Sequence, residues 1–164
     1  MRPSGAEVCF RTELRMADAD AVERLIVRSG VFNAEEIATA RELVEDTLAD
    51  RRGADYRFVM IDGPLGLESY ACFGPIMGAA GRYELYWIAT DPSCEGRGLG
   101  RLLMAEVERL VRMLGGSHIF AETSTRADYA AAHALYRACG YTLFADVPDY
   151  HADGDGMAIY GKRL

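Results

Sequence analysis

The sequence predicts one mixed α/β domain, and three observations lead to this prediction. Strand-like alternation and helix-like periodicity follow one another in the order β-α-α-β-β-β-α-β-α-β-β. The chain has 164 residues, enough for one hydrophobic core of ordinary size. No repeat, low-complexity tract or interdomain linker interrupts these patterns, so we assign residues 1–164 to a single domain.

The N-terminal part is predicted to contain one strand and two helices. Apolar and polar residues alternate over residues 8–14, which predicts a strand. Asp18 and Asp20 are residues that favour helix starts, and apolar residues recur at helical spacing after them. Asn33 and Glu36 have the spacing of a capping box, so we expect the second helix to begin at Asn33.

The middle of the chain is predicted to form a hairpin, a further strand and a long amphipathic helix. Branched and aromatic residues over 56–61 and 67–73 predict the two hairpin strands, and residues 82–90 the next strand. Apolar residues from Leu99 onward then recur on one face of a helix. Gly115, which follows the last apolar position, is expected to end that helix.

The C-terminal part is predicted to contain three strands and one helix. We expect a short strand over residues 118–122 and an alanine-rich helix over residues 129–139. Two closing strands follow, over residues 141–147 and 157–162. The acidic stretch 146–155 between them is expected to be a polar loop.

The composition excludes several classes of protein. The formal net charge is −7, which argues against binding to nucleic acid through a basic face. No apolar run reaches the roughly 20 residues that a membrane span requires, and residues 1–7 do not lead into the apolar core of a signal peptide. We therefore expect a cytoplasmic protein without a membrane partner. The four cysteines and three histidines match no zinc pattern, so no metal is expected.

The most informative segment is residues 87–101, where a strand leads through a short turn into a helix. Gly96, Gly98 and Gly100 lie where the helix begins. Glycine allows close approach of a ligand, and the free N–H groups of a helix start attract phosphate. A P-loop is excluded because no lysine follows Gly100, and a Rossmann fingerprint is weak because Arg101 occupies the place of its third glycine.

Three segments together resemble the GNAT N-acetyltransferase family: Ile88-Ala89-Thr90-Asp91-Pro92, Gly98-Leu99-Gly100-Arg101-Leu102-Leu103 and Leu135-Tyr136-Arg137-Ala138-Cys139-Gly140-Tyr141. Their order and spacing match the family, and the resemblance covers nearly the whole chain. It implies a mixed, mostly antiparallel sheet of about six to seven strands, flanked by about four helices. A splayed central strand of this sheet would bind coenzyme A.

The resemblance implies acetyl-CoA as co-substrate and assigns residues to it. The strand segment Ile88, Ala89 and Thr90 would pair with the pantetheine arm, and an N–H near Ile88 would polarise the thioester carbonyl. The pyrophosphate would lie on the loop and helix start formed by Gly96, Arg97, Gly98, Leu99, Gly100 and Arg101. Two positions depart from the family pattern. Glu95 replaces the usual glutamine or arginine, and Tyr129 replaces a frequent asparagine but remains a candidate cofactor contact.

Two residues are expected to carry the chemistry. By resemblance, Tyr136 is the general acid that protonates the departing thiolate. Glu84, thirteen residues before Arg97, matches the general base of histone-type family members, although a water chain is an equal alternative. Both assignments have structural alternatives, namely an aromatic core residue for Tyr136 and an outward-facing strand residue for Glu84.

The sequence therefore predicts transfer of an acetyl group to a primary amine of a small molecule or peptide. The early helices and the loops around Phe32 and Tyr150 would form the acceptor wall. Two other functions stay open: a catalytically weak CoA-binding sensor or interaction module, and a regulator that acetylates a macromolecule such as charged tRNA. The net charge of −7 argues against RNA. Edge strands near the C-terminus make a homodimer an expectation from the family.

Overall fold

The computed structural model describes residues 8–51 and 56–164. The expectation about residues 1–7 lies outside the described residues. The elements follow the predicted order, and their bounds are β1 (Phe10–Arg11), α1 (Asp18–Ser29), α2 (Ala34–Leu48), β2 (Arg57–Gly63), β3 (Gly66–Pro75), β4 (Arg82–Thr90), α3 (Leu99–Met113), β5 (His118–Ser124), α4 (Ala130–Ala138), β6 (Thr142–Ala152) and β7 (Asp155–Arg163). Short 3₁₀ turns at Pro92–Cys94 and Ala127–Tyr129 precede α3 and α4.

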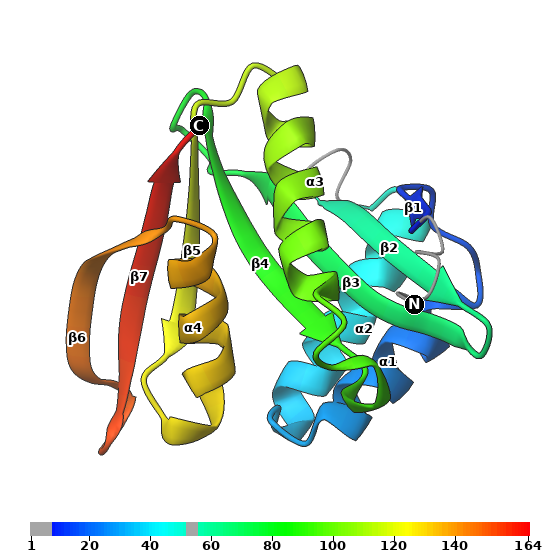
Figure 1. Cartoon of the computed structure of the whole chain (residues 1–164), viewed down its shortest axis with the longest axis horizontal. Helices are drawn as coiled ribbons and strands as arrows, with labels where there is room; N and C mark the ends of the chain where they lie inside the picture. Colours follow the sequence, from blue (N-terminus) through cyan, green and yellow to red (C-terminus); the bar gives the residue numbers. More distant parts are fainter. Residues whose placement is uncertain (1–7, 52–55) are drawn as a thin grey trace, which may run out of the picture.

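The strands form one seven-stranded sheet in the order β1-β2-β3-β4-β5-β7-β6 (Figure 1). All neighbouring strands are antiparallel except β4 and β5, which are parallel. This sheet confirms the predicted mixed, mostly antiparallel α/β architecture. In the described part of the chain, no helix has both the length and the apolar character that a membrane span needs.

Helices cover both faces of the sheet, and each face has its own core. Leu25 and Ile26 of α1 and Val44 of α2 pack with the sheet residues Met60 and Tyr70 on one face. Helices α3 and α4 lie against the opposite face, as Figure 1 shows. The core of that face contains Phe73, Leu103, Met104, Val107, Ile119 and Tyr160. The helical periodicity of the sequence therefore corresponds to burial on two separate faces.

The C-terminal hairpin corrects one prediction. Residues 146–155 are not a polar loop, because β6 continues to Ala152 and β7 begins at Asp155. The ladder has an irregularity between Val147 and Ala152, where Asp149 has a positive φ of 53°. The Asp149 carboxylate accepts a hydrogen bond from the Gly154 N–H at 2.7 Å. This side-chain bond supports the hairpin end, so polar composition alone misidentified a strand as a loop.

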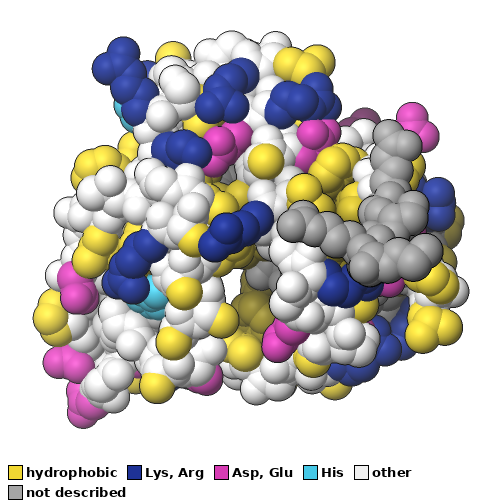
Figure 2. Space-filling view, viewed as in Figure 1, with side chains coloured by type: hydrophobic (Ala, Val, Ile, Leu, Met, Phe, Trp, Pro, Cys, Tyr) yellow, Lys and Arg dark blue, Asp and Glu magenta, His cyan; other side chains and the backbone are white. Residues whose placement is uncertain are grey.

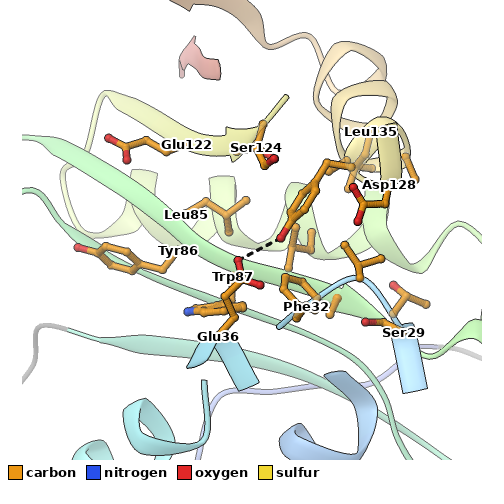
Figure 3. A pocket seen from close by; sticks show the side chains of 18 of the residues that line it. Ser29, Phe32, Glu36, Leu85, Tyr86, Trp87, Glu122, Ser124, Asp128 and Leu135 are labelled. Carbon is orange, nitrogen blue, oxygen red and sulfur yellow. Dashed lines mark hydrogen bonds between the residues drawn. The ribbon is translucent and has the colours of Figure 1, made fainter. Parts of the chain in front are cut away.

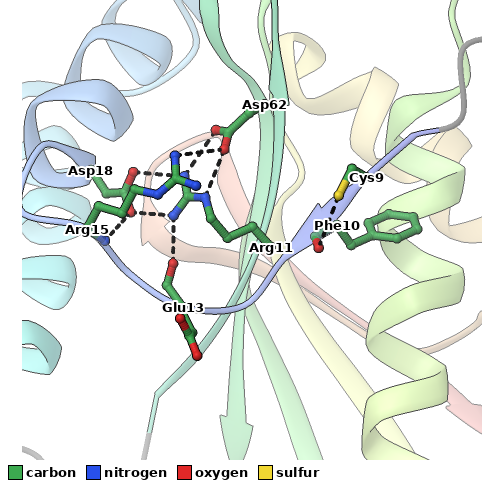
Figure 4. Close-up of polar contacts among 7 residues, drawn as sticks. All are labelled: Cys9, Phe10, Arg11, Glu13, Arg15, Asp18 and Asp62. Carbon is green, nitrogen blue, oxygen red and sulfur yellow. Dashed lines mark hydrogen bonds and ion pairs between the residues drawn. The ribbon is translucent and has the colours of Figure 1, made fainter.

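The first strand is also shorter than predicted. Only Phe10 and Arg11 pair with β2, although alternation predicts a strand over residues 8–14. The chain leaves the sheet because Arg11 binds three groups at the entrance to α1 (Figure 4). Its guanidinium donates to the Glu13 carbonyl at 2.7 Å, to the Asp18 carboxylate at 2.7 and 3.0 Å, and to the Asp62 carboxylate at 2.8 and 3.0 Å. Arg11 thus joins β1, α1 and β2.

We expect Arg11→Met to lower the free energy of unfolding by about 2–4 kcal/mol, because Asp18 would lose its buried cation. The side chain of Asp18 is 5% exposed, so water cannot replace the guanidinium fully. Denaturant unfolding measures the loss. Arg41→Met is the matched control, since Arg41 binds Asp20, Glu23 and Glu45 on the surface, and it should lose much less. An equal loss in both variants would contradict the role of burial.

The same network makes stability depend on pH. The hydrogen bond from Arg11 is the main reason why the pKa of Asp62 is lowered from its ordinary value. A lowered folded-state pKa stabilises the protein above the unfolded-state pKa of about 4. That contribution is lost as the pH falls through the lower, folded-state value. The stability difference between wild type and Arg11→Met should therefore shrink on acidification.

Candidate active site

A cleft of about 900 Å³ lies where β4 and β5 diverge. Its walls come from these two strands, the start of α3, one face of α4, and the segment from Ser29 into α2. Figure 2 shows the surface hollowed between α3 and α4, and Figure 3 shows side chains that line the cleft. The predicted site residues that line it are Glu84, Ile88, Ala89, Thr90, Gly96, Gly100, Tyr129 and Tyr136.

The cleft exposes one edge of β4. Strand β4 pairs with β5 over only three residues, Arg82–Glu84 against His118–Phe120. Its other edge pairs with β3 as far as Thr90. Ile88 and Ala89 therefore lie in a strand whose cleft-side edge has no partner among the described strands. Free N–H and C=O groups on such an edge can bind an extended chain as an added strand.

A β-bulge interrupts β4 beside the cleft. The register changes between Cys72, which faces Trp87, and Phe73, which faces Leu85, so Tyr86 is the extra residue. As a result Tyr86 and Trp87 both pack with the α1–α2 core, whereas Leu85 belongs to the α3–α4 core. The bulge thus turns two consecutive aromatic side chains toward one side of the cleft. The alternation of apolar and polar residues in the sequence does not reveal that the side chains change faces at Tyr86.

The start of α3 has the geometry expected of an anion site. Gly96 and Gly98 have φ values of 75° and 79°, in the left-handed region that favours glycine. The helix begins at Leu99, and no side chain caps it. The N–H groups of its first turn are therefore available to a ligand, at the positive end of the helix dipole. A Cβ on Gly100 would lie 3.2 Å from Leu135 Cδ2, so glycine also permits the close packing of α3 on α4.

The arginines of this loop do not reach the cleft. Arg97 is half-exposed, and its Nη1 lies 2.8 Å from Glu68 Oε2 on β3. Arg101 is exposed and, like Gly98 and Leu99, does not line the cleft. The Leu99 side chain is instead buried in the α3–α4 core. Glu95 does line the cleft, so the structure supports backbone N–H groups rather than arginine side chains as the anion-binding groups.

Tyr136 projects from α4 into the cleft while its ring is buried. The residue is 5% exposed and packs 5.3 Å from the Tyr160 ring and 6.1 Å from the Tyr141 ring, between centroids. Burial, with a smaller effect of Tyr160, raises its pKa well above the ordinary value. Among the described residues, no hydrogen-bond partner of its hydroxyl is found. The phenol is therefore protonated at neutral pH and available to a ligand.

His133 and Tyr160 support Tyr136 from behind. His133 Nε2 lies 2.8 Å from the Ser124 carbonyl, which can only accept, so this nitrogen carries a proton. In neutral His133, Nδ1 then accepts a hydrogen bond from the Tyr160 hydroxyl, 2.8 Å away. This bond holds the Tyr160 ring against Tyr136. Sequence patterns could not reveal this support, because Tyr160 lies on β7, 27 residues after His133.

Tyr129 lies on the other side of the cleft, facing α2. Its hydroxyl donates to Glu36 Oε1 at 3.1 Å, across 93 residues of sequence, and this bond is the dashed line in Figure 3. Arg126 lies 5.3 Å above the Tyr129 ring. Burial, followed by the nearby Glu36 charge, raises the pKa of Tyr129 above its ordinary value. Glu36 also completes the capping box with Asn33, as predicted, so one carboxylate connects the start of α2 to the cleft.

Glu84 faces a second carboxylate across the strands. Glu84 pairs with Phe120 in the parallel ladder, which places Glu122 close to it on the same face. Burial, followed by the charge of Glu122, raises the pKa of Glu84 above the ordinary value. A carboxylate with a raised pKa is a better proton acceptor when ionised. No group of three or more His, Cys, Asp or Glu among the described residues has the arrangement of a metal site.

The acceptor wall was predicted in part. Phe32 lines the cleft and packs 5.2 Å from Trp87 and 6.1 Å from Tyr129, between ring centroids. Tyr150 does not line it and is 59% exposed, whereas its neighbour His151 does. Helix α1 contributes only its last residue, Ser29, while α2 contributes several. The early helices therefore shape the wall mainly through α2.

Comparisons with known proteins agree with this fold. A crystal structure of a protein from Desulfovibrio desulfuricans assigned to the GNAT family is 37% identical, covers 95% of this chain and 98% of its own, and superposes with a TM-score of 0.89. A Salmonella typhimurium acetyltransferase structure with acetyl-CoA has 18% identity, a TM-score of 0.76, and coverage of 97% and 95%. An uncharacterised Mycobacterium leprae protein is 39% identical over 81 residues, which are 49% of this chain and 21% of that protein.

A family profile matches most of the part of the chain that builds the cleft. The profile is that of the Acetyltransferase (GNAT) family, and it covers residues 31–141. This range extends from Val31 before α2 to Tyr141 after α4, and it includes β4 and the α3 loop. Acetylation dependent on acetyl-CoA is general in that family. The chain therefore belongs to the GNAT acetyltransferase family, as the three sequence segments predicted.

Proposed function

We propose that this protein transfers the acetyl group of acetyl-CoA to a primary amine of a small molecule or peptide. The observation that carries the proposal is the cleft itself. It joins the uncapped start of α3, the free edge of β4, the Tyr136 hydroxyl and the Glu84 carboxylate in one space of about 900 Å³. Each of these groups matches one requirement of acetyl transfer.

Two of these features fit the shape of acetyl-CoA. The first-turn N–H groups of α3 would bind the pyrophosphate. The free edge at Ile88 and Ala89 would bind the amide groups of the pantetheine arm, which places the thioester beside the bulge of β4. A backbone N–H near Ile88 would then stabilise the oxyanion that forms on the thioester carbonyl.

Glu84 and Tyr136 would handle the protons. Glu84 accepts a proton from the acceptor ammonium, directly or through water, so that the neutral amine attacks the thioester carbon. A C–N bond forms, the C–S bond breaks, and Tyr136 donates its proton to the departing thiolate. Burial raises the pKa of the phenol, and it raises the pKa of a thiol in the same pocket in the same direction, so the transfer stays balanced. One ammonium and one thioester give one amide, one thiol and one proton.

A turnover screen tests the proposal. Thiol release from acetyl-CoA is followed with a panel of aliphatic amines, amino acids and short peptides, and the products are identified by mass spectrometry. Amide formation with any primary amine supports the proposal. Binding of acetyl-CoA without turnover would favour a CoA-binding sensor, and acetylation confined to a macromolecule would favour a regulator.

Glu84→Gln should lower kcat about 100-fold, because the amine loses its base. In the wild type, kcat/KM should fall on acidification through the raised pKa of Glu84, above the ordinary glutamate value of about 4.3. The variant should lack this acidic limb. Glu35→Gln, an exposed α2 carboxylate that does not line the cleft, is the control. A limb that persists in Glu84→Gln would show that another ionisable group serves as base.

Glu84→Gln should lower activity but raise the stability of the fold at neutral pH. A carboxyl whose folded-state pKa is raised favours folding only while it is protonated, and that advantage is lost as the pH rises through the folded-state pKa. At neutral pH, Glu84 is ionised at a cost to stability. Glu84→Gln should therefore raise Tm at neutral pH and lose this gain at low pH, which separates its catalytic effect from misfolding.

A further inference from the structure

The cleft carries a strong excess of negative charge. Its one basic side chain among the described residues is Arg126, whereas seven acidic residues line it: Glu36, Glu42, Glu84, Glu95, Glu122, Asp128 and Asp155. Arg126 is already engaged, because it lies 3.1 Å from Asp128 and 3.8 Å from Asp155. Glu36 caps α2 and binds Tyr129. Glu42 also has an interaction partner. Within residues 8–51 and 56–164, only part of the negative charge in the cleft is therefore neutralised.

Glu84 and Glu122 have no opposite charge beside them. Both lie on the same face of neighbouring strands, and each repels the other enough to affect the pKa of Glu84. Neither takes part in an ion pair with another described residue. Glu84 is half-buried and Glu122 is exposed, and a cation beside them would offset their mutual repulsion. One acceptor ammonium at Glu84 would leave Glu122 available to a second positive group.

Aromatic rings continue from these carboxylates along the same cleft. Phe32 and Trp87 pack 5.2 Å apart, and Tyr56 and Tyr86 also pack 5.2 Å apart. Figure 3 shows Tyr86 on the side of Glu122, and Phe32 close to Trp87 and Glu36. Aromatic faces bind methylene groups by burial and attract ammonium groups through their quadrupole. Rings beside these carboxylates suit an aliphatic chain that carries positive charge.

The unpartnered Tyr136 hydroxyl indicates independently where the reacting end lies. Tyr136 is 5% exposed and lines the cleft. Its hydroxyl has no hydrogen-bond partner among the described residues. This hydroxyl reaches the cleft, where it is free to bond a ligand atom. The thioester end of the reaction therefore belongs between α4 and β4. The rest of the acceptor would then lie beside Tyr86, toward Glu122 on β5.

We propose that the acceptor is a linear aliphatic diamine or polyamine, with one amine at Glu84 and a second ammonium held by Glu122. This inference rests on the proposed acetyl transfer and specifies its substrate class. Only one amine is acetylated, with release of one thiol and one proton, and the second amine keeps its proton. Glu122 is here a specificity residue rather than a proton carrier.

The test compares amines of equal length that differ in charge. The specificity constant kcat/KM is measured for diaminobutane and spermidine, for butylamine, and for the neutral-ended aminobutanol. We expect diaminobutane to exceed butylamine about three- to fivefold, the worth of one ion pair with an exposed carboxylate. The ratio should fall with added salt, because an ion pair is screened. Glu122→Gln should lower the ratio to near one, Glu122→Asp should restore part of it, and Glu35→Gln should not change it.

A measurement on the wild type keeps the test independent of folding of the variants. Tetramethyldiaminobutane has two charged tertiary amines that cannot form a stable amide. It should inhibit butylamine acetylation competitively, and dimethylbutylamine, which has the same chain and one charge, should inhibit much less. A diaminobutane-to-butylamine ratio near one, or equal inhibition by the two tertiary amines, would overturn this inference. Turnover with amino acids or peptides but not with diamines would overturn it and leave the proposed function intact. Turnover with no amine would overturn both.

Discussion

Tyr136→Phe should lower kcat about 100-fold or more while the Kd for acetyl-CoA stays close to that of the wild type. The lost hydroxyl is the only proton donor that this position offers to the departing thiolate, and general acid catalysis contributes about 10²–10⁴-fold. The ring remains, so its packing against Tyr160 and Tyr141 is kept. Steady-state kinetics with the best amine of the panel gives kcat, and calorimetry gives the Kd.

Tyr141→Phe is the matched control for this experiment. Tyr141 is also buried and packs 6.1 Å from the Tyr136 ring, but it does not line the cleft. Its loss of a hydroxyl should leave kcat near the wild-type value. A leaving group that needs no proton also separates the roles. With an acetyl thioester of an acidic aromatic thiol, Tyr136→Phe should lose much less activity, and an equal loss would contradict proton donation by Tyr136.

Gly98→Glu should weaken the binding of acetyl-CoA by about 100-fold or more. Gly98 has a φ of 79°, where any other residue is strained by about 1–2 kcal/mol. The new carboxylate would also lie at the uncapped start of α3, where it would satisfy N–H groups that the pyrophosphate needs and repel its charge. Calorimetric titration of acetyl-CoA and of coenzyme A measures both effects.

Gly78→Glu separates the strain from the loss of the anion site. Gly78 has a φ of 76° and open space around its Cβ, as Gly98 does, but it lies in the turn between β3 and β4. Gly78→Glu should lower the free energy of unfolding about as much as Gly98→Glu does, but the Kd for acetyl-CoA should stay at the wild-type value. If both variants keep that Kd, the start of α3 does not bind the pyrophosphate. Arg97→Ala offers a further comparison, since its pairing with Glu68 predicts only a small effect on binding.

Local sequence patterns predicted most of the fold because their causes are local. A capping box needs two residues three apart, and Asn33 and Glu36 form it as expected. Amphipathic periodicity set α3 against the sheet, and alternation identified the strands. Polar composition misled at residues 146–155, because there an Asp149 side chain bonds the Gly154 backbone and the hairpin extends.

In the candidate site too, contiguous features could be predicted from the sequence and contacts between distant residues could not. Strand, glycines and helix start are contiguous, so the loop before α3 could be identified from residues 87–101 alone. Tyr136 and Glu84 could be assigned only through the family resemblance, and both line the cleft. The sequence could not reveal that Arg97 binds Glu68, because that partner is 29 residues away on another strand.

The sequence by itself determined the order of elements, the glycine-rich start of α3 and the family, since each depends on residues close together in the chain. Only the tertiary structure decided what the acceptor meets. The divergence of β4 and β5, the bulge at Tyr86 and the pairing of Tyr129 with Glu36 all depend on contacts between distant segments. So does the meeting of Glu84 with Glu122, which one parallel register sets. Charged side chains affect one another only when the backbone brings them close together on one face. No local sequence pattern specifies the distance between side chains on different strands.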